Sequence, residues 1–387
     1  MKVGYFVDWV EVYCLESEKI NCIDRLQALN YRVEVMPYTT RVYGQVCEIL
    51  SESGEPVGTL CRCPLSVKGE GTNGILKRGA CHFKIHNRNC YQENVGLYVM
   101  QFCKSIGLSI VSISRVDFCA DFQYFYNGLN PVHLIKGFAS EKYLKVKQPR
   151  FSLHGTTEKG YNQYNSVLFG SRNSNIYTRF YCKTLEMAEQ GTKSWIVDCW
   201  KALDFDLTKQ VWRVEFAVKA PGRKALDRKT AEVKEITISD LCSRTKIKHW
   251  FLSLSKTYFV FKRAEEGKRK YDCETLVLFD YKESESEYRP LPTTHTGVTK
   301  RMDKMVYDYL RRESKKVSEY SDQERIDYAK TAGTILWKKR LHEWEGWKYG
   351  SPLEVLPVGE PVKNPLTQVQ GEIDQQDETE LFKQEEP

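Results

Sequence analysis

The chain has 387 residues, of which 41% are hydrophobic and 12% aromatic, so it is long enough to bury one large core or two modest ones. No stretch approaches the ~20 consecutive apolar residues that a membrane-spanning helix needs, and residues 1–13 carry Asp8 and Glu11 where a signal peptide would be uncharged. The sequence therefore predicts a globular protein of the cytoplasm that does not associate with membranes. Its 13 cysteines are expected to be reduced and to act mostly as small buried hydrophobes.

The net charge of +7 is unevenly distributed along the chain. Residues 351–387 contain nine carboxylates and two lysines, a net charge of −7, so the rest of the chain carries +14. A body this basic favours a polyanionic partner such as nucleic acid, although a soluble basic protein can reach the same charge without binding DNA. The same C-terminal residues have four prolines before residue 366 and one aromatic residue, which predicts a disordered acidic tail.

Strand and helix patterns follow each other in the first part of the chain. Residues 5–13 are rich in β-branched and aromatic side chains, which predicts a strand. Within residues 93–106 the apolar residues recur at helical spacing, and Gly107 is a stop signal. A second strand is predicted over residues 108–122.

The middle of the chain predicts more strands, and the C-terminal part predicts helices. Residues 165–183 predict a hairpin because two apolar-rich runs flank the turn-forming residues 173–175. Residues 212–219 predict another strand, and residues 321–324 form a capping box that opens a helix. These patterns indicate three parts, namely a domain over residues 1–228, a mainly helical region over 229–350 and the tail over 351–387.

Two strands carry nearly the same polar motif. In residues 114–122 the even-numbered residues from 116 onward are apolar, so period-2 alternation places Arg115, Asp117 and Asp121 together on the other face. The strand at 212–219 repeats this arrangement with Arg213 and Glu215, and the segments Arg-Val-Asp-Phe and Arg-Val-Glu-Phe nearly copy each other. The sequence therefore predicts an α+β fold built on a curved, mainly antiparallel sheet with an internal duplication.

The second strand of the hairpin adds two phenols to the polar set. Its alternation places Tyr177, Arg179, Tyr181 and Lys183 on one face. If the three strands share a sheet, their carboxylates could hold a divalent ion, their guanidinium groups could neutralise a phosphorane, and a phenol could attack phosphorus. For any single strand, the simpler interpretation is a solvated face with ordinary cross-strand ion pairs.

These residues, in this order, resemble a known family. Ser-Arg-Val-Asp-Phe-x-x-Asp-Phe, then Phe-Gly-Ser-Arg-x-Ser with Arg-Phe-Tyr-x-Lys-x-x-Glu, then Trp-Arg-Val-Glu-Phe are similar to motifs of the replication initiation factor (Rep_trans) family. That family comprises rolling-circle plasmid initiators and related relaxases of conjugative elements. The resemblance spans roughly residues 5–220, and its most specific part is the Gly-Ser-Arg hairpin.

The resemblance implies a site and a reaction. Tyr181 would be the nucleophile that nicks one DNA strand at an origin and forms a 5′-phosphotyrosyl intermediate with a priming 3′-OH, and Tyr177 would be its reserve. Asp117 and Glu215 would bind Mg²⁺ or Mn²⁺, with Asp121 and Glu186 at further acidic positions of the family. The remaining expected site residues are basic: Arg172, Arg179 and Lys183 for catalysis, and Arg115, Arg213, Lys246 and Lys248 for binding DNA. Candidate further partners are a host helicase and a second copy of the chain, as a homodimer.

Alternatives to an initiator remain open at this point. A relaxase that starts conjugal transfer would use the same chemistry, and a non-catalytic DNA-binding regulator would need the basic body but not Tyr181. The basic, aromatic-rich stretch after residue 230 is equally consistent with DNA contact and with helices that have solvated faces over an aromatic core. The histidine-dependent class of nicking enzymes is disfavoured, because none of the seven histidines is two residues from another.

Overall fold

The computed structural model describes residues 2–67, 76–158, 161–226 and 233–282. Contacts divide the chain into two units, Met1–Thr293 and Thr294–Pro387, and the second unit lies outside the described residues. The predicted helix that begins at residues 321–324 and the predicted acidic tail both fall in that second unit.

The main element of the fold is a ten-stranded sheet in which every pair of neighbouring strands is antiparallel. Its strand order is β2-β3-β4-β5-β1-β6-β11-β10-β9-β8. The strands are β1 (Val3–Glu16), β2 (Arg32–Val35), β3 (Tyr43–Leu50), β4 (Pro56–Pro64), β5 (Ala80–Ile85), β6 (Leu108–Phe122), β8 (Phe151–Glu158), β9 (Tyr161–Phe169), β10 (Ile176–Cys182) and β11 (Trp212–Lys219).

Helices and two small strand pairs complete the described part of the chain. The predictions of an α+β class and of a mainly antiparallel sheet are therefore confirmed. The helices are α1 (Cys22–Ala28), α2 (Asn87–Cys90), α3 (Val95–Ser105), α4 (Pro131–Ala139), α5 (Lys183–Gln190), α6 (Ser194–Ala202) and α7 (Arg244–Tyr258), with 3₁₀ turns η1 (Ala220–Gly222) and η2 (Ile238–Cys242). The small pairs join β12 (Lys224–Leu226) to β13 (Val233–Glu235), and β7 (Tyr143–Lys145) to β14 (Phe261–Arg263).

The repeated motif lies on two adjacent strands. β6 and β11 are antiparallel neighbours, and Phe118 lies directly opposite Phe216. Both rings are fully buried on the core face. The two motifs therefore meet at the centre of the sheet, where their apolar residues share one core and their polar residues share the opposite face.

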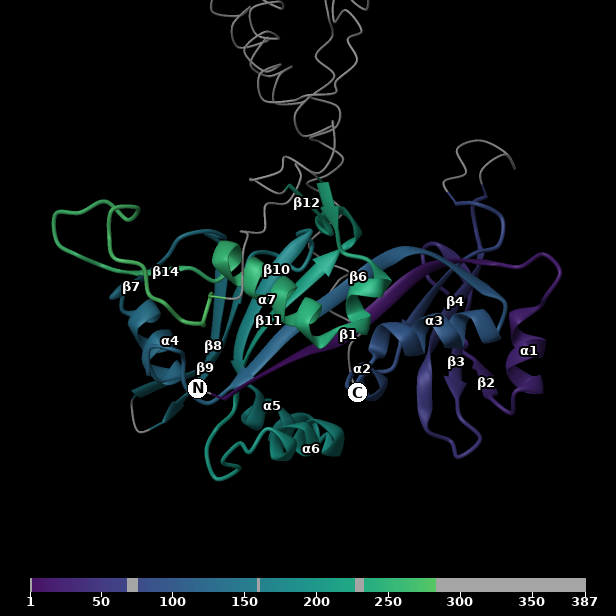
Figure 1. The fold of residues 1–387 in the computed structure, drawn as a ribbon, viewed down its shortest axis with the longest axis horizontal. Helices are drawn as coiled ribbons and strands as arrows, with labels where there is room; N and C mark the ends of the chain where they lie inside the picture. The colour runs from purple at the N-terminus through teal and green to yellow at the C-terminus, as the bar shows by residue number, and fades with distance from the viewer. Residues whose placement is uncertain (1, 68–75, 159–160, 227–232, 283–387) are drawn as a thin grey trace, which may run out of the picture. The chain divides into compact units, whose positions relative to one another are not determined.

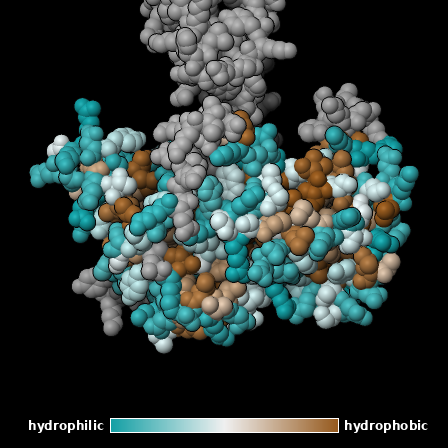
Figure 2. Space-filling view, in the orientation of Figure 1, coloured by the Kyte–Doolittle hydropathy of each residue, from teal (hydrophilic) through white to brown (hydrophobic). Residues whose placement is uncertain are grey.

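Helices α3 and α7 cover the core face. In α3 the residues at helical spacing are buried, and Gly107, just after the helix, adopts a φ of 79°, which suits a residue without a Cβ. In α7 the Phe251 ring lies 5.2 Å from the Phe216 ring. Figure 1 shows α7 lying across the central strands, and Figure 2 shows hydrophobic residues gathered on this side over α3, where Leu97 is exposed.

Residues after 228 contribute to the core of the first unit. The first unit continues to Thr293, because α7 packs on the sheet and β14 pairs with β7. The described residues 233–282 contain one α-helix, one 3₁₀ turn and two short strands. The apolar face of α7 forms part of the main core and stabilises the sheet, and this explains the aromatic residues of that region.

The polar face of the central strands is also covered, which contradicts the interpretation of a solvated face. Asp117, Asp121, Arg213 and Glu215 are all at most 2% exposed. A second apolar cluster lies over one end of this face and is built from residues of α5, α6 and the segment before β11: Met187, Ile196, Trp200, Phe205 and Val211. Charged groups in this setting need partners, and the structure provides them.

Lys145 is a buried amine at the end of β7, and it predicts a pH dependence of stability. Its ammonium donates to the backbone carbonyls of Lys147 and Tyr258 and lies 4.9 Å from the centre of the Phe169 ring. Burial, followed by the charges of Lys270 and Lys147, lowers the pKa of Lys145 to about 7. Between that value and the ordinary lysine pKa, the unfolded chain binds one more proton than the folded chain, so stability rises with pH in this window.

We compare the wild type with Lys145→Met and take the difference between their free energies of unfolding at each pH. This difference should increase in favour of the wild type by about 3 kcal/mol between pH ~6.5 and pH ~9.5. Taking the difference between the two proteins cancels the other titrating groups and the pH-independent loss of two hydrogen bonds. Urea denaturation at both pH values measures it. A difference that does not change with pH would show that Lys145 titrates normally.

Candidate active site

The three polar strands identified from the sequence lie side by side. β11 pairs with β10 on one side and with β6 on the other. On the polar face the register produces three rows across β10, β11 and β6. These rows are Tyr177, Ala217 and Asp117; Arg179, Glu215 and Cys119; and Tyr181, Arg213 and Asp121. Two phenols, two guanidinium groups and three carboxylates therefore share one face of the sheet.

Tyr181 is held by a carboxylate and a guanidinium. Its hydroxyl donates to Oε2 of Glu215 at 3.0 Å and accepts from Nη2 of Arg179 at 3.2 Å. The same guanidinium nitrogen lies 3.1 Å from Oε2 of Glu215, so the three groups form a closed triad. Burial, and after it the negative charge of Glu215, raise the pKa of the Tyr181 phenol well above its usual value.

This triad opens into a pocket of about 470 Å³ between β8, β9, β10 and α5. Tyr181 and Arg179 line it together with Arg172 and Glu186, so the pocket collects four of the predicted site residues. His154, on β8, also lines it, in the same cross-strand row as Ser166 and Tyr181. The pocket therefore gives a buried phenol access to a cavity large enough for a nucleotide phosphate and its sugar.

Lys183 lies behind the pocket rather than in it. Its ammonium is 2.6 Å from Oε2 of Glu186 and 5.6 Å from the centre of the Tyr181 ring, and the side chain is 1% exposed. Burial, followed by the nearby charge of Arg213, lowers the pKa of Lys183. Lys183 can therefore position Glu186 and the phenol ring, but it does not reach the cavity.

Asp117 and Glu215 are diagonal neighbours on the polar face. Asp117 lies opposite Ala217, two residues from Glu215 on the same strand, and both carboxylates are 2% exposed. Arg115 holds Asp117 through two hydrogen bonds, from Nε at 2.8 Å and from Nη2 at 2.6 Å. Burial raises the pKa of Asp117 to about 7, and the charge of Glu215 adds to this effect while the Arg115 hydrogen bonds oppose it.

The observed arrangement reduces the predicted set of metal ligands. Among the described residues, no group of three or more His, Cys, Asp or Glu side chains lies close enough to hold a metal ion. Mg²⁺ is often bound by one or two carboxylates together with waters and phosphate oxygens. Two buried carboxylates that repel each other, and that each pair with one arginine, fit such a cation. Asp117 and Glu215 are the pair that fits.

Asp121 and Arg213 form a buried ion pair on the polar face. Arg213 donates from Nε and Nη2 to the two oxygens of Asp121 at 2.6 and 2.7 Å, and Trp200 donates to the same carboxylate at 2.8 Å. Both charged side chains are fully buried. Asp121 and Arg213 thus pair with each other beneath α6, and their expected roles in metal and DNA binding stay predictions.

Asp8 belongs to this buried network and was not identified from the sequence. It accepts from Nη1 of Arg213 at 2.6 Å and from the hydroxyl of Tyr91. The charges of Arg213 and Lys183 hold the pKa of Asp8 below its usual value, although burial, the largest single influence, raises it. The register of β1 shifts between Val7 and Trp9, and this bulge turns Asp8 and Trp9 to the same face, which simple alternation does not predict.

Lys246 and Lys248 are not brought to the site. Both lie on α7, on the core side of the sheet, whereas Tyr181 is on the polar side. Lys246 pairs with Asp240 at 2.9 Å, and the Lys248 ammonium lies 5.7 Å from the centre of the Tyr5 ring. Any DNA contact by these lysines would be separate from contact at the Tyr181 pocket.

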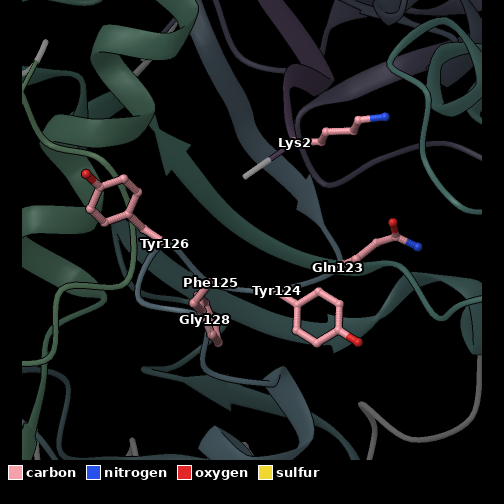
Figure 3. A pocket seen from close by; sticks show the side chains of 6 residues that line it. All are labelled: Lys2, Gln123, Tyr124, Phe125, Tyr126 and Gly128. Atoms are coloured by element: carbon pink, nitrogen blue, oxygen red, sulfur yellow. The ribbon is translucent and has the colours of Figure 1, made fainter.

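A second pocket, of about 290 Å³, lies beside the segment that follows β6. Lys2 and the aromatic residues Tyr124, Phe125 and Tyr126 are among the residues that line it, and Figure 3 shows that the two tyrosines point away from each other. The Lys2 ammonium is 3.7 Å from the Asp204 carboxylate. Since the described residues that line this second pocket include no carboxylate and no arginine, the pocket at Tyr181 is the better candidate for a reaction site.

Comparisons with known proteins give a distant structural neighbour. No protein-family model matches the chain, and no curated protein matches its sequence. Among solved structures, the fold is similar to that of the rolling circle replication initiator protein from Geobacillus stearothermophilus, with 12% sequence identity and a TM-score of 0.43. The similarity covers 71% of this chain and 92% of that one. The family resemblance of the strand motifs therefore stays a prediction. None of the described helices is long and apolar enough to cross a membrane.

Proposed function

We propose that this chain is a rolling-circle replication initiator that nicks one DNA strand with Tyr181. The observation that carries the proposal is the hydroxyl of Tyr181, held between Glu215 and Arg179 at the wall of a pocket that Arg172 also lines. A nucleophile within hydrogen-bond distance of a base, with a cationic group at the same atom, is the arrangement that phosphodiester cleavage needs.

The contacts assign a role to each group. Glu215 accepts the phenol proton as the Tyr181 oxygen attacks phosphorus, the bond from phosphorus to the 3′ oxygen breaks, and the proton passes on to that oxygen. Arg179 stabilises the charge on the phenolate and then on the phosphorane. The products are a 5′-phosphotyrosyl bond, which keeps the strand attached, and a 3′-OH that can prime synthesis. Before DNA binds, the raised pKa keeps the phenol protonated and unreactive.

Asp117 and Glu215 would hold Mg²⁺ or Mn²⁺, which would polarise a non-bridging phosphate oxygen. In the structure, Arg115 and Arg179 neutralise these carboxylates, and their side chains are 24% and 40% exposed. A DNA phosphate at the pocket mouth is a competing partner for both guanidinium groups. We propose that DNA binding turns the arginines toward phosphate and frees the carboxylates for the cation. A host helicase and a second copy of the chain remain the further partners expected from the sequence.

The test is to incubate the protein with supercoiled DNA of the replicon that encodes it, with Mg²⁺ or Mn²⁺. We expect open circles whose 5′ end at the nick is bound to protein after denaturation, and mapping the nick identifies the recognition site. DNA that is retarded on a native gel but never nicked would instead identify a non-catalytic regulator. Neighbouring genes for a coupling protein would favour a relaxase with the same chemistry.

The carboxylate pair gives a separate prediction. Asp117→Asn and Glu215→Gln should each raise the Mn²⁺ concentration needed for half-maximal nicking by about tenfold or more, because a neutral amide is a poorer ligand for a hard cation. Nicking rates across a Mn²⁺ titration measure this shift. Asp198→Asn, in an exposed pair with Lys201 on α6, is the matched control and should not change the titration. If both site variants nick normally at low Mn²⁺, the carboxylate pair does not bind the metal.

A further inference from the structure

We propose that Tyr177 is a second nucleophile, which attacks a second phosphodiester after Tyr181 has become attached to the first. This inference rests on the proposed function and extends it. It makes the chain capable of two successive strand transfers, which is the number needed to open a circle and to close it again.

The main observation is a second triad, in which a guanidinium joins a phenol to a buried carboxylate as in the first, without the direct hydrogen bond that Tyr181 donates to Glu215. The Tyr177 hydroxyl accepts from Nη2 of Arg115 at 2.9 Å, and the same nitrogen donates to Asp117 at 2.6 Å. Tyr181 has the equivalent partners in Arg179 and Glu215. Each phenol therefore has its own guanidinium, and each guanidinium has its own buried carboxylate.

The two triads also match in burial and orientation. Tyr177 and Tyr181 are both 6% exposed, and both project from β10 onto the polar face. Arg115 reaches Tyr177 from β6, across the intervening strand, where Ala217 lies between Tyr177 and Asp117. Because alanine is small, it leaves room for the guanidinium to bridge the two strands. A larger side chain at this position would separate the phenol from the carboxylate.

The spacing indicates that the phenols serve different phosphates. Four residues of strand separate their Cα atoms by about 13 Å, and side chains stand roughly perpendicular to a sheet. A reacting pair must approach to about 3–3.5 Å, so a phosphate placed for one hydroxyl is too far from the other. Tyr177 also lies outside the set of described residues that line the Tyr181 pocket. The two phenols therefore cannot share one phosphate, and the proposal assigns a second scissile phosphate to Tyr177.

The chemistry balances without a further reactant. The Tyr177 oxygen attacks phosphorus of a second site, the bond to the 3′ oxygen breaks, and the phenol proton passes to that oxygen. The released 3′-OH attacks phosphorus of the Tyr181 adduct and forms a new phosphodiester, and its proton passes to the departing Tyr181 oxygen. Each step breaks one phosphate ester and forms one. The first strand is rejoined while the second remains attached through Tyr177.

The experiment uses oligonucleotides that span the mapped nick site. The full-length protein is first allowed to form its adduct with one oligonucleotide, and a second, labelled oligonucleotide with a sulfur in place of the bridging 3′ oxygen is then added, so that the second cleavage cannot reverse. Trypsin cuts after Arg172, Arg179 and Lys183, so a peptide of residues 173–179 contains only Tyr177 and a peptide of residues 180–183 contains only Tyr181. Mass spectrometry then shows which tyrosine carries the second strand.

We expect the second label on the 173–179 peptide, at a rate that does not change when the adduct is diluted. With an unmodified second oligonucleotide, Tyr177→Phe should form the first adduct within about twofold of the wild-type rate but yield the joined product roughly a hundredfold more slowly. Tyr98→Phe, which loses a hydroxyl on α3 over the core face, should match the wild type in both steps.

Two outcomes would overturn the inference and leave the proposed function intact: joined product at the wild-type rate from Tyr177→Phe, or a second label found on peptides other than 173–179. A second cleavage whose rate falls in proportion to dilution would also overturn it, because the second nucleophile would then come from another molecule. Failure of the wild type to form the first adduct would overturn the proposed function and this inference together.

Discussion

Tyr181→Phe is expected to lower nicking and covalent attachment by roughly 10³-fold or more while leaving DNA affinity nearly unchanged. The change removes only the attacking oxygen. Glu215 keeps its ion pair with Arg179, so no buried carboxylate loses its only partner and the fold should persist. Denaturing gels of end-labelled DNA measure the adduct, and native gels measure the affinity.

The control for this variant is Tyr98→Phe, which also loses one hydroxyl but on the opposite face of the sheet. It should nick as the wild type does. Adduct formation by Tyr181→Phe at the wild-type rate would show that another residue makes the first cut, and Tyr177 would be tested next. A variant that lost DNA binding together with nicking would instead indicate damage to the surface around the pocket.

The second large effect concerns stability. Asp121→Asn should lower the free energy of unfolding by about 3–5 kcal/mol, because it leaves the fully buried Arg213 guanidinium with one carboxylate, Asp8, in place of two. The amide has nearly the volume of the carboxylate, so the loss reports charge pairing rather than a cavity. Urea denaturation followed by tryptophan fluorescence measures it.

Asp198→Asn is the matched control on the surface. Its carboxylate pairs with the exposed Lys201, and its loss should cost less than about 1 kcal/mol. Equal urea midpoints for Asp121→Asn and Asp198→Asn would mean that Arg213 has access to water or to other partners.

Local patterns were enough to identify the central strands and their polar residues. Period-2 alternation assigned Asp117 and Glu215 to one face because a strand's side chains alternate whatever it packs against, and the repeated Arg-x-acid-Phe motif marked the two strands that prove to be neighbours. Turn residues placed the β9–β10 hairpin, and helical spacing placed α3. These features depend only on residues close together in the sequence.

The tertiary structure decided which polar residues remain available for chemistry. The alternation of polar and apolar residues does not predict that α6 covers Asp121 and Arg213. The helix and these strands are separate in the sequence and meet only through tertiary packing. The contact of Asp8 with Arg213, and the bulge in β1 that places Trp9 on the same face, depend on pairing between strands that are distant in the sequence. The residues of the two triads come from three strands, β6, β10 and β11, so the sequence alone does not show which arginine and carboxylate contact each phenol. Long-range pairing therefore determined the roles of residues whose chemical types the sequence had already indicated.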